Sequence, residues 1–472
     1  MGALSDVGPS TEADVRPGKG ITSRIAERRV VEVAATVAGG RAYEKGRALE
    51  PGTVPDFNTT RDAGRISLHN EWVALARART PETSPVTPPL RLSRRFAHTL
   101  VGIAALGLAP RVAAQPASSI PSRLSDRELW QLNSDFSEPS GYFRSDNFLS
   151  NETGFQFVIP DLVASIRPGG VYLGVGPEQN FTYIAALKPK IAIIVDIRRG
   201  NMMAHLMYKA LFELSADRAE FLSRLFSRPR PPGLDSASTA KQLFDAYIAA
   251  PTDPSLYRTN LAAIKKRLIE NHGFAMNDSD SKLLDYTYGA YFGGGPLIDY
   301  TYPRGFGPGG FPTYASLQQA TDSAGKNWAY LASESTFRWL KDFESRNLLV
   351  PVVGDFAGPK AIRSVAQWLK ARNAVVSAFY TSNVEQYLFM QGSDWDRYYR
   401  NVATLPLDSS SSFIRSIGGG RGMAMPPRAA MQQSIIGGRN RAPSVTSSIQ
   451  GLLRAFTEGR ISAYADVIAM SR

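Results

Sequence analysis

Residues 171–196 read VYLGVGPEQNFTYIAALKPKIAIIVD, and this stretch decides the fold. An apolar run meets a turn at Gly174 and Gly176, a short helical pattern follows, and a second apolar run ends at Asp196. A nucleotide-binding βαβ unit has this order of strand, glycine turn, helix, strand and acid. The glycines let the backbone approach a ligand at a helix N-terminus, and Asp196 lies where a ribose hydroxyl would bind. We therefore predict a ligand site where these strands end.

The alternation of strands and helices continues after a long interruption. Further apolar runs lie at 348–353, 374–380 and 413–417, with helical patterns between them. They predict an α/β domain over residues 122–417, with a doubly wound and mostly parallel sheet. Residues 229–346 read as a large helical insertion, with helices expected at 236–249, 254–271, 279–291 and 326–346. Its aromatic loop at 293–314 is expected to cover the ligand cleft.

The two ends of the chain differ from this domain. Residues 1–93 mix charge, glycine and proline, and we expect them to be disordered or to precede the true translation start. Residues 94–114 have the basic start, apolar run and small residues of a secretory signal, and the alternative is a buried hydrophobic helix. A working signal would direct the protein to the periplasm or outside the cell; otherwise it is cytoplasmic. Residues 418–443 are predicted to be a flexible linker, and 444–472 an amphipathic helix.

Composition excludes several classes of function. The chain has 472 residues, 43% of them hydrophobic, which is enough for a sizeable core. The net charge of +12 is scattered, so nucleic acid is not expected as a partner, and no apolar run is long enough for a transmembrane helix. The chain has no cysteine, and its 4 histidines lack metal-ligand spacing, so no metal is expected. A small-molecule ligand remains as the expected partner, and the pattern indicates no particular oligomeric state.

Residues 140–228 and 346–417 resemble the class I S-adenosylmethionine-dependent methyltransferases, in a divergent bacterial branch. The matching positions are Gly174 and Gly176 as the glycine motif, Asp196 as the ribose acid, and Asp355 and Phe356 as the strand end beside the adenine. The resemblance implies a Rossmann-like fold, S-adenosyl-L-methionine as the cofactor, and transfer of its methyl group to an unspecified acceptor. Two positions depart from the family, because Tyr172 replaces the usual acid and Glu178 replaces the third glycine.

Glu178 bears on the charge of the ligand. A carboxylate in the first turn of a helix would repel a pyrophosphate and attract the ammonium and sulfonium groups of S-adenosylmethionine. The same residue can equally be a surface acid that only balances the helix dipole.

Methyl transfer needs proximity, in-line alignment and at most a weak base. The candidates facing the cleft are Tyr380, Asn383 and Glu385 for catalysis, and Asn151 and Glu152 for the substrate. Each of these side chains can also serve a structural hydrogen bond. Two other functions stay open: an exported, non-catalytic binding protein on a methyltransferase-like fold, and a dinucleotide-binding, oxidoreductase-like protein.

Overall fold

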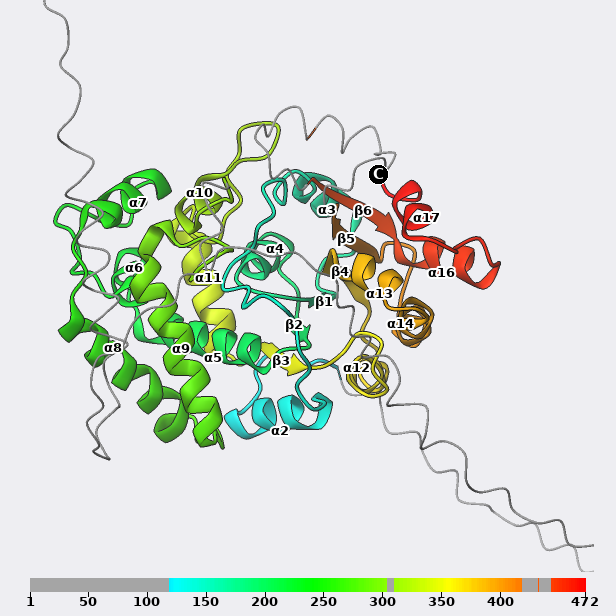
Figure 1. Ribbon diagram of the computed structural model, residues 1–472, viewed down its shortest axis with the longest axis horizontal. Helices are drawn as coiled ribbons and strands as arrows, with labels where there is room; N and C mark the ends of the chain where they lie inside the picture. Colours follow the sequence, from blue (N-terminus) through cyan, green and yellow to red (C-terminus); the bar gives the residue numbers. More distant parts are fainter. Residues whose placement is uncertain (1–118, 304–309, 418–431, 433–442) are drawn as a thin grey trace, which may run out of the picture. The chain divides into compact units, whose positions relative to one another are not determined.

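The structure is a computed structural model that describes residues 119–303, 310–417, 432 and 443–472. Within these residues, six strands form one sheet in the order β3-β2-β1-β4-β5-β6 (Figure 1). The strands are β1 (Val171–Gly174), β2 (Ile191–Asp196), β3 (Leu349–Val353), β4 (Val376–Ser382), β5 (Ser412–Ser416) and β6 (Ser444–Ser448). Neighbours among the first five strands pair in parallel, and β6 is antiparallel to β5. The predicted α/β class and mostly parallel sheet are therefore confirmed.

Strands β1, β2 and β3 are apolar and buried along their whole length. This is typical of a parallel sheet that is covered on both faces, and it includes β3 although β3 lies at the edge of the sheet. In the paired register, Gly174 lies beside Ile194, and Asp196 lies beside Val353. The ends of β1, β2 and β3 are thus aligned, which brings the glycine turn and the acid of the first motif to one edge of the sheet.

The chain changes its direction of travel across the sheet between β1 and β4. From β1 it moves outward through β2 to β3, and it then returns to place β4 on the other side of β1. In open parallel sheets, ligands bind beyond the carboxyl ends of the strands at such a reversal. The fold therefore predicts the same site as the sequence motif.

Helices connect the strands and build the insertion. Those next to the strands in sequence are α2 (Asp126–Phe136), α3 (Ile159–Ser165), α4 (Gln179–Leu187), α5 (Arg199–Leu214), α12 (Ala361–Lys370), α13 (Val384–Met390), α14 (Asp394–Val402), α16 (Ile449–Thr457) and α17 (Tyr464–Ala469). Between β2 and β3 lie also α6 (Arg218–Phe226), α7 (Ala240–Ala249), α8 (Pro254–Lys265), α9 (Asp278–Gly294), α10 (Tyr314–Gln319) and α11 (Glu334–Ser345), with a π-helix at Lys266–Asn271 and a 3-10 turn at Gly295–Leu297. The chain between β2 and β3 is thus mostly helical.

Helix α5 joins the sheet to the insertion. It contacts β2 and β3 of the sheet and α9 and α11 of the insertion. Its Phe212 ring stacks on Phe221 at 4.7 Å between centroids and lies 5.5 Å from Phe337. Met203 and His205 on the same helix are almost fully buried. The apolar core of the sheet therefore continues into the helical insertion.

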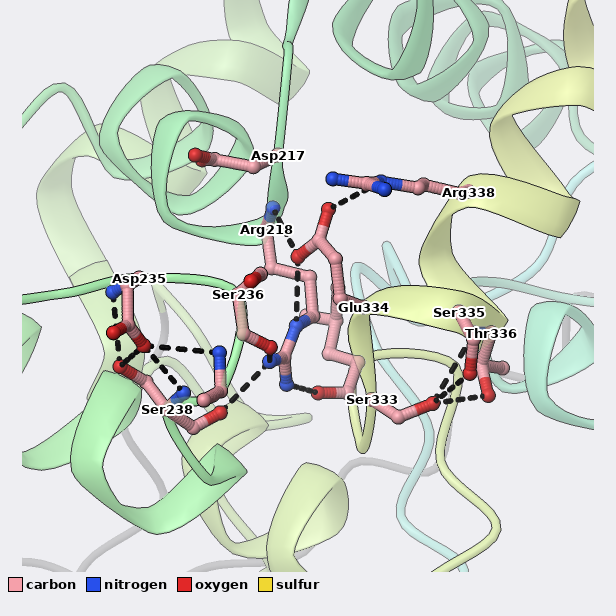
Figure 2. Close-up of polar contacts among 12 residues, drawn as sticks. Asp217, Arg218, Asp235, Ser236, Ser238, Ser333, Glu334, Ser335, Thr336 and Arg338 are labelled. Atoms are coloured by element: carbon pink, nitrogen blue, oxygen red, sulfur yellow. Dashed lines mark hydrogen bonds and ion pairs between the residues drawn. The ribbon is translucent and has the colours of Figure 1, made fainter.

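A buried arginine ties two segments of the insertion together (Figure 2). Arg218, at the start of α6, is 1% exposed and forms an ion pair of 3.1 Å with Glu334 at the start of α11. Its other guanidinium nitrogens donate to the carbonyl oxygens of Leu331 at 3.0 Å, Ser236 at 3.1 Å and Ser238 at 2.7 Å. One fully satisfied guanidinium thus fixes the two segments where α7 and α11 begin.

Two sequence predictions about helices were wrong. The C-terminal residues 444–472 do not form one amphipathic helix, because Ser444–Ser448 pair as β6 on the edge of β5 and the helices α16 and α17 follow. Val445 and Thr446 favour a strand, and the free edge of β5 offers unpaired backbone groups to it. The helix expected over 326–346 begins only at Glu334, because the side chain of Ser333 caps it there.

Several predictions fall outside the described residues. These are the disordered region or upstream segment at 1–93, the signal-like segment at 94–114, and all but two residues of the linker at 418–443. They stay predictions. Among the helices that the structure describes, none is long and apolar enough to cross a membrane.

Candidate functional site

A cavity of about 330 Å³ opens where β1, β2, β3 and β4 end. Eight of the residues proposed from the sequence line it, and they are Gly176, Asp196, Asp355, Phe356, Tyr380, Asn383, Asn151 and Glu152. Three others, Gly174, Glu178 and Glu385, are not among the lining residues. The topology therefore gathers most of the expected site from five separate segments of the chain.

The two glycines of the turn have different roles. Gly176 has a φ of +77°, and the position that a Cβ would take has no atom within 4 Å, so its backbone is open for close approach. A Cβ on Gly174 would instead lie 2.0 Å from Oδ1 of Asn180 and 2.9 Å from the ring of Tyr172. Gly174 is thus required for packing beneath the turn, and Gly176 for the exposed surface of the turn.

Asn180, which sequence reasoning missed, holds the glycine turn in shape. Its Nδ2 donates to the carbonyl oxygens of Val175 at 2.9 Å, Gly176 at 3.2 Å and Pro177 at 2.7 Å. The hydroxyl of Tyr172 donates to its Oδ1 at 2.9 Å. Tyr172, which departs from the methyltransferase pattern, therefore helps Asn180 to support the glycine turn. The signal in the sequence was an amide in the first turn of the helix after the glycines.

Asp196 lines the cavity at the end of β2, but its carboxylate is already bonded. The backbone N–H and Nε of Arg198 donate to Oδ1 at 2.9 and 3.0 Å, and Nη2 donates to Oδ2 at 2.9 Å. Arg198 also lines the cavity and donates to the carbonyl oxygen of Ser145 at 3.2 Å. A ligand hydroxyl can use the remaining lone pairs of the Asp196 carboxylate, in an orientation that Arg198 sets.

Asp355 and Phe356 follow β3 at the same edge of the cavity. Burial raises the pKa of the Asp355 carboxyl, and the like charges of Asp394 and Glu138 raise it further. Oδ1 of Asp355 accepts the N–H of Ala357 at 2.9 Å, the turn bond that a capping role would give. The Phe356 ring stacks on Tyr398 at 5.4 Å and offers an apolar surface to the cavity.

Glu152 is a buried carboxyl group of the cavity wall, held by side chains from other segments. It is 2% exposed, and its Oε1 accepts the hydroxyls of Tyr380 at 2.8 Å and Ser382 at 2.5 Å. Its Oε2 accepts Nε2 of Gln179 at 2.8 Å. Burial raises the pKa of Glu152, and these hydrogen bonds oppose the shift. The structure thus connects the segment before β1, helix α4 and the end of β4 through one carboxylate.

The end of β4 is strained where it borders the cavity. Ser382 has a φ of +51°, a conformation that costs a residue other than glycine free energy and that clusters at functional sites. Its neighbour Asn383 lines the cavity, as does Tyr380. Glu385 does not, because its carboxylate accepts Nη2 of Arg415 at 3.0 Å and the hydroxyl of Tyr399 at 2.7 Å in the core. The catalytic role considered for Glu385 is therefore replaced by a buried ion pair.

Glu178 differs from its expected place as well. It is 1% exposed, one of its oxygens has no hydrogen-bond partner, and burial raises its pKa to about 8. It acts electrostatically on the hydroxyls of Tyr208, Tyr291, Tyr314 and Tyr330 around it. Glu178 is therefore neither a surface acid nor a residue of the cavity wall, because its side chain is buried in the protein.

Aromatic side chains surround the opening of the cavity. Tyr300 and Phe311, 5.6 Å apart, line it from the loop that the sequence placed over the cleft. Phe143 and Tyr387 meet edge to face at 5.3 Å, and Tyr142 is 84% exposed. The site thus combines flat apolar surfaces with carboxylates and amides, a lining that suits a planar ligand with hydroxyl and amino groups.

Comparisons with known proteins place the chain in a family. A family described as a domain of unknown function (DUF7790) matches residues 147–284 and 304–438, more than half of the chain, and these ranges contain every candidate site residue. The curated proteins gave no match. In the part of the chain that the structure describes, no group of three or more His, Asp or Glu side chains is placed to hold a metal ion. The chain belongs to the DUF7790 family.

Proposed function

We propose that the protein is an S-adenosylmethionine-dependent methyltransferase on a Rossmann-like, doubly wound fold. The observation that carries this proposal is the cavity itself, which lies at the reversal of strand order. It combines the open glycine Gly176 after β1, Asp196 at the end of β2, and Asp355 with Phe356 after β3. An adenosyl group requires these three successive contacts, since it presents a flat base, a ribose diol and a short chain.

The residues present fit such a group. The open backbone at Gly176 leaves a cradle for the chain that follows the ribose, because no protein atom lies where its Cβ would be. Asp196 can accept a ribose hydroxyl, and Phe356 can pack against the base with Asp355 beside its amino group. Glu152 places a further carboxylate in the cavity wall, which disfavours a pyrophosphate and therefore a dinucleotide.

The cofactor, when bound, supplies an activated methyl group. The protein then needs to align an acceptor and to exclude water. Tyr380 and Asn383 line the cavity at the end of β4. We assign them to orienting the acceptor, with Asn151 next to Glu152 on the facing segment. The acceptor enters between Tyr300, Phe311 and these residues.

Isothermal titration calorimetry on the full chain tests the assignment, with S-adenosylmethionine, S-adenosylhomocysteine and NAD as ligands. We expect the first two to bind and NAD not to bind. Asp196→Asn should weaken both adenosyl ligands about tenfold, since a charged acceptor of a hydrogen bond is lost. Binding of NAD alone would favour the dinucleotide alternative, and binding of none of the three would reject the methyltransferase proposal.

A second candidate, a non-catalytic binding protein on the same fold, has one observation in its favour. Glu385 is engaged with Arg415, and Tyr380 donates its hydroxyl to Glu152, so two of the three proposed catalytic groups already have partners. The signal-like segment at 94–114 would make this an exported protein. Binding of S-adenosylmethionine without methyl transfer to any acceptor in a cell extract would favour this candidate, and N-terminal sequencing of the native protein would test export.

A further inference from the structure

The Glu152 carboxylate lies in the cavity wall without a cation beside it. Its hydrogen-bond partners are neutral side chains, those of Tyr380, Ser382, Gln179 and Ser416. Among the residues that the structure describes, no Lys, Arg or His forms an ion pair with it. These partners orient the carboxylate toward a fixed position but leave its charge uncompensated.

A second buried glutamate, Glu178, lies near Glu152. Glu178 directly precedes Gln179, the residue that donates to Glu152, and the charge of Glu152 raises the pKa of Glu178 beyond the effect of burial. The groups around Glu178 come from four other segments and are all tyrosine hydroxyls, on Tyr208, Tyr291, Tyr314 and Tyr330. The main causes of the pKa shifts of Glu152 and Glu178 include no charge of a Lys or Arg side chain. With a pKa of about 8, Glu178 is mostly protonated at pH 7.5, so the negative charge of this cavity wall comes from Glu152.

We propose that Glu152 selects a ligand with a positive charge at the end of β4, so that the site distinguishes S-adenosylmethionine from S-adenosylhomocysteine by the sulfonium. This inference rests on the proposed function and adds a specificity-determining residue to it. The two compounds share the base, the ribose, the ammonium and the carboxylate. They differ by one methyl group and one positive charge, so their affinity ratio isolates the charge near the sulfur.

The location of Glu152 supports the sulfonium as its partner. Its carboxylate is bonded to Tyr380 and Ser382, which lie at the end of the strand where the acceptor is expected. Methyl transfer removes the positive charge from the sulfur. The product then leaves the Glu152 carboxylate without its counter-charge, which favours exchange of product for fresh cofactor.

The size of the effect follows from Coulomb's law. A unit charge about 6 Å from a carboxylate, at an effective dielectric constant of about 20, corresponds to roughly a hundredfold in affinity before desolvation is subtracted. We therefore expect the full chain to bind S-adenosylmethionine about tenfold or more tightly than S-adenosylhomocysteine. Sinefungin, which carries a protonated amine in place of the sulfonium, should bind like S-adenosylmethionine.

The test is calorimetry at pH 7.5 on the wild type and on Glu152→Gln. The variant keeps the shape of the side chain but removes its charge, so the affinity ratio of the two compounds should fall to within about threefold of unity. Glu344→Gln is the matched control, because Glu344 is also a fully buried glutamate whose pKa is raised to about 8, and it does not line the cavity. It should leave the ratio unchanged.

The outcomes separate this inference from the proposed function. Equal affinities in the wild type, or an unchanged ratio in Glu152→Gln, would overturn the charge selection while S-adenosylmethionine binding stands. If S-adenosylmethionine, S-adenosylhomocysteine and sinefungin all fail to bind, both proposals are rejected. Glu178→Gln, outside the cavity lining, is a second control that should leave the ratio nearly unchanged, because Glu178 is mostly protonated at pH 7.5. If Glu152→Gln does not fold, the affinity ratio of the wild type still decides the inference.

Discussion

At the end of β2, the guanidinium of Arg198 donates two parallel hydrogen bonds to the carboxylate of Asp196. Nε donates to Oδ1 at 3.0 Å, and Nη2 donates to Oδ2 at 2.9 Å. The acid that the sequence proposed for a ribose is therefore not a free group. The guanidinium fixes the direction of its remaining lone pairs, and it is itself held by the backbone of Ser145. Ligand affinity should consequently depend on Arg198 even where a ligand never touches it.

We predict that Arg198→Gln weakens binding of S-adenosylmethionine about fivefold to tenfold, because the Asp196 carboxylate loses its fixed orientation. Calorimetry on the variant measures this directly. Arg338→Gln serves as the control, since Arg338 is 65% exposed and lies on α11 away from the cavity lining. An affinity for Arg198→Gln equal to that of the wild type would show that the ion pair is irrelevant to the ligand.

The two glycines of the turn should respond differently to alanine. Gly174→Ala places a methyl group against Asn180 and Tyr172, so we expect a loss of about 1–3 kcal/mol in the free energy of unfolding. Gly176→Ala meets no atom but has a φ of +77°, so it should lose about 1–2 kcal/mol. Only the second change projects a methyl group into open space at the cavity. Urea denaturation measures the loss of stability, and calorimetry measures the loss of ligand affinity. We expect Gly176→Ala to lose more affinity than its loss of stability explains, and Gly174→Ala not to do so.

Removal of the buried arginine should be costly. Arg218→Met removes the buried guanidinium partner of Glu334 and the donor to the carbonyl oxygens of Leu331, Ser236 and Ser238 (Figure 2). We predict a loss of about 3–5 kcal/mol in the free energy of unfolding, measured by denaturant titration. Arg338→Met breaks the exposed bond to the same Glu334, and its loss should stay below about 1 kcal/mol. Similar losses for the two variants would contradict the burial argument.

Glu344 should make stability depend on pH. Burial raises its pKa from 4.5 to about 8, and the charge of Glu213 adds to the shift while that of Lys209 opposes it. The folded state therefore holds this proton over a range in which the unfolded chain has lost it. Its contribution is complete below pH 4.5 and is lost as the pH rises toward about 8, at about 1.4 kcal/mol per pH unit.

Glu344→Gln has no such proton. Between pH 5 and 8, its stability curve should rise relative to that of the wild type with roughly that slope, as measured by urea denaturation at several pH values. Parallel curves for the two proteins would mean that Glu344 ionises normally in the folded chain.

Local pattern in the sequence predicted the strands well because they are short, apolar and bounded by turns. Val171–Gly174 and Ile191–Asp196 match the predicted runs. The strand at Ser444–Ser448 was missed because its pairing depends on the edge of β5, which local periodicity does not report.

The sequence predicted some residues of the candidate site correctly and others not. Residues at strand ends, such as Asp196 and Tyr380, reached the cavity because parallel topology fixes where strands end. Glu178 and Glu385 did not, because partners from distant segments decide which way a helical side chain turns. Arg415 attracts Glu385 inward, and a cluster of tyrosines surrounds Glu178. Neither partner could be identified before the fold was known.

The continuity between the sheet core and the helical insertion through α5 bears on how the molecule comes apart. Phe212 and its aromatic neighbours pack in both regions at once, so no boundary in the core separates the sheet from the helical insertion. Excising residues 229–346 would strip one flank of α5 and expose its rings to water. The insertion and the sheet should therefore melt together in a single cooperative transition.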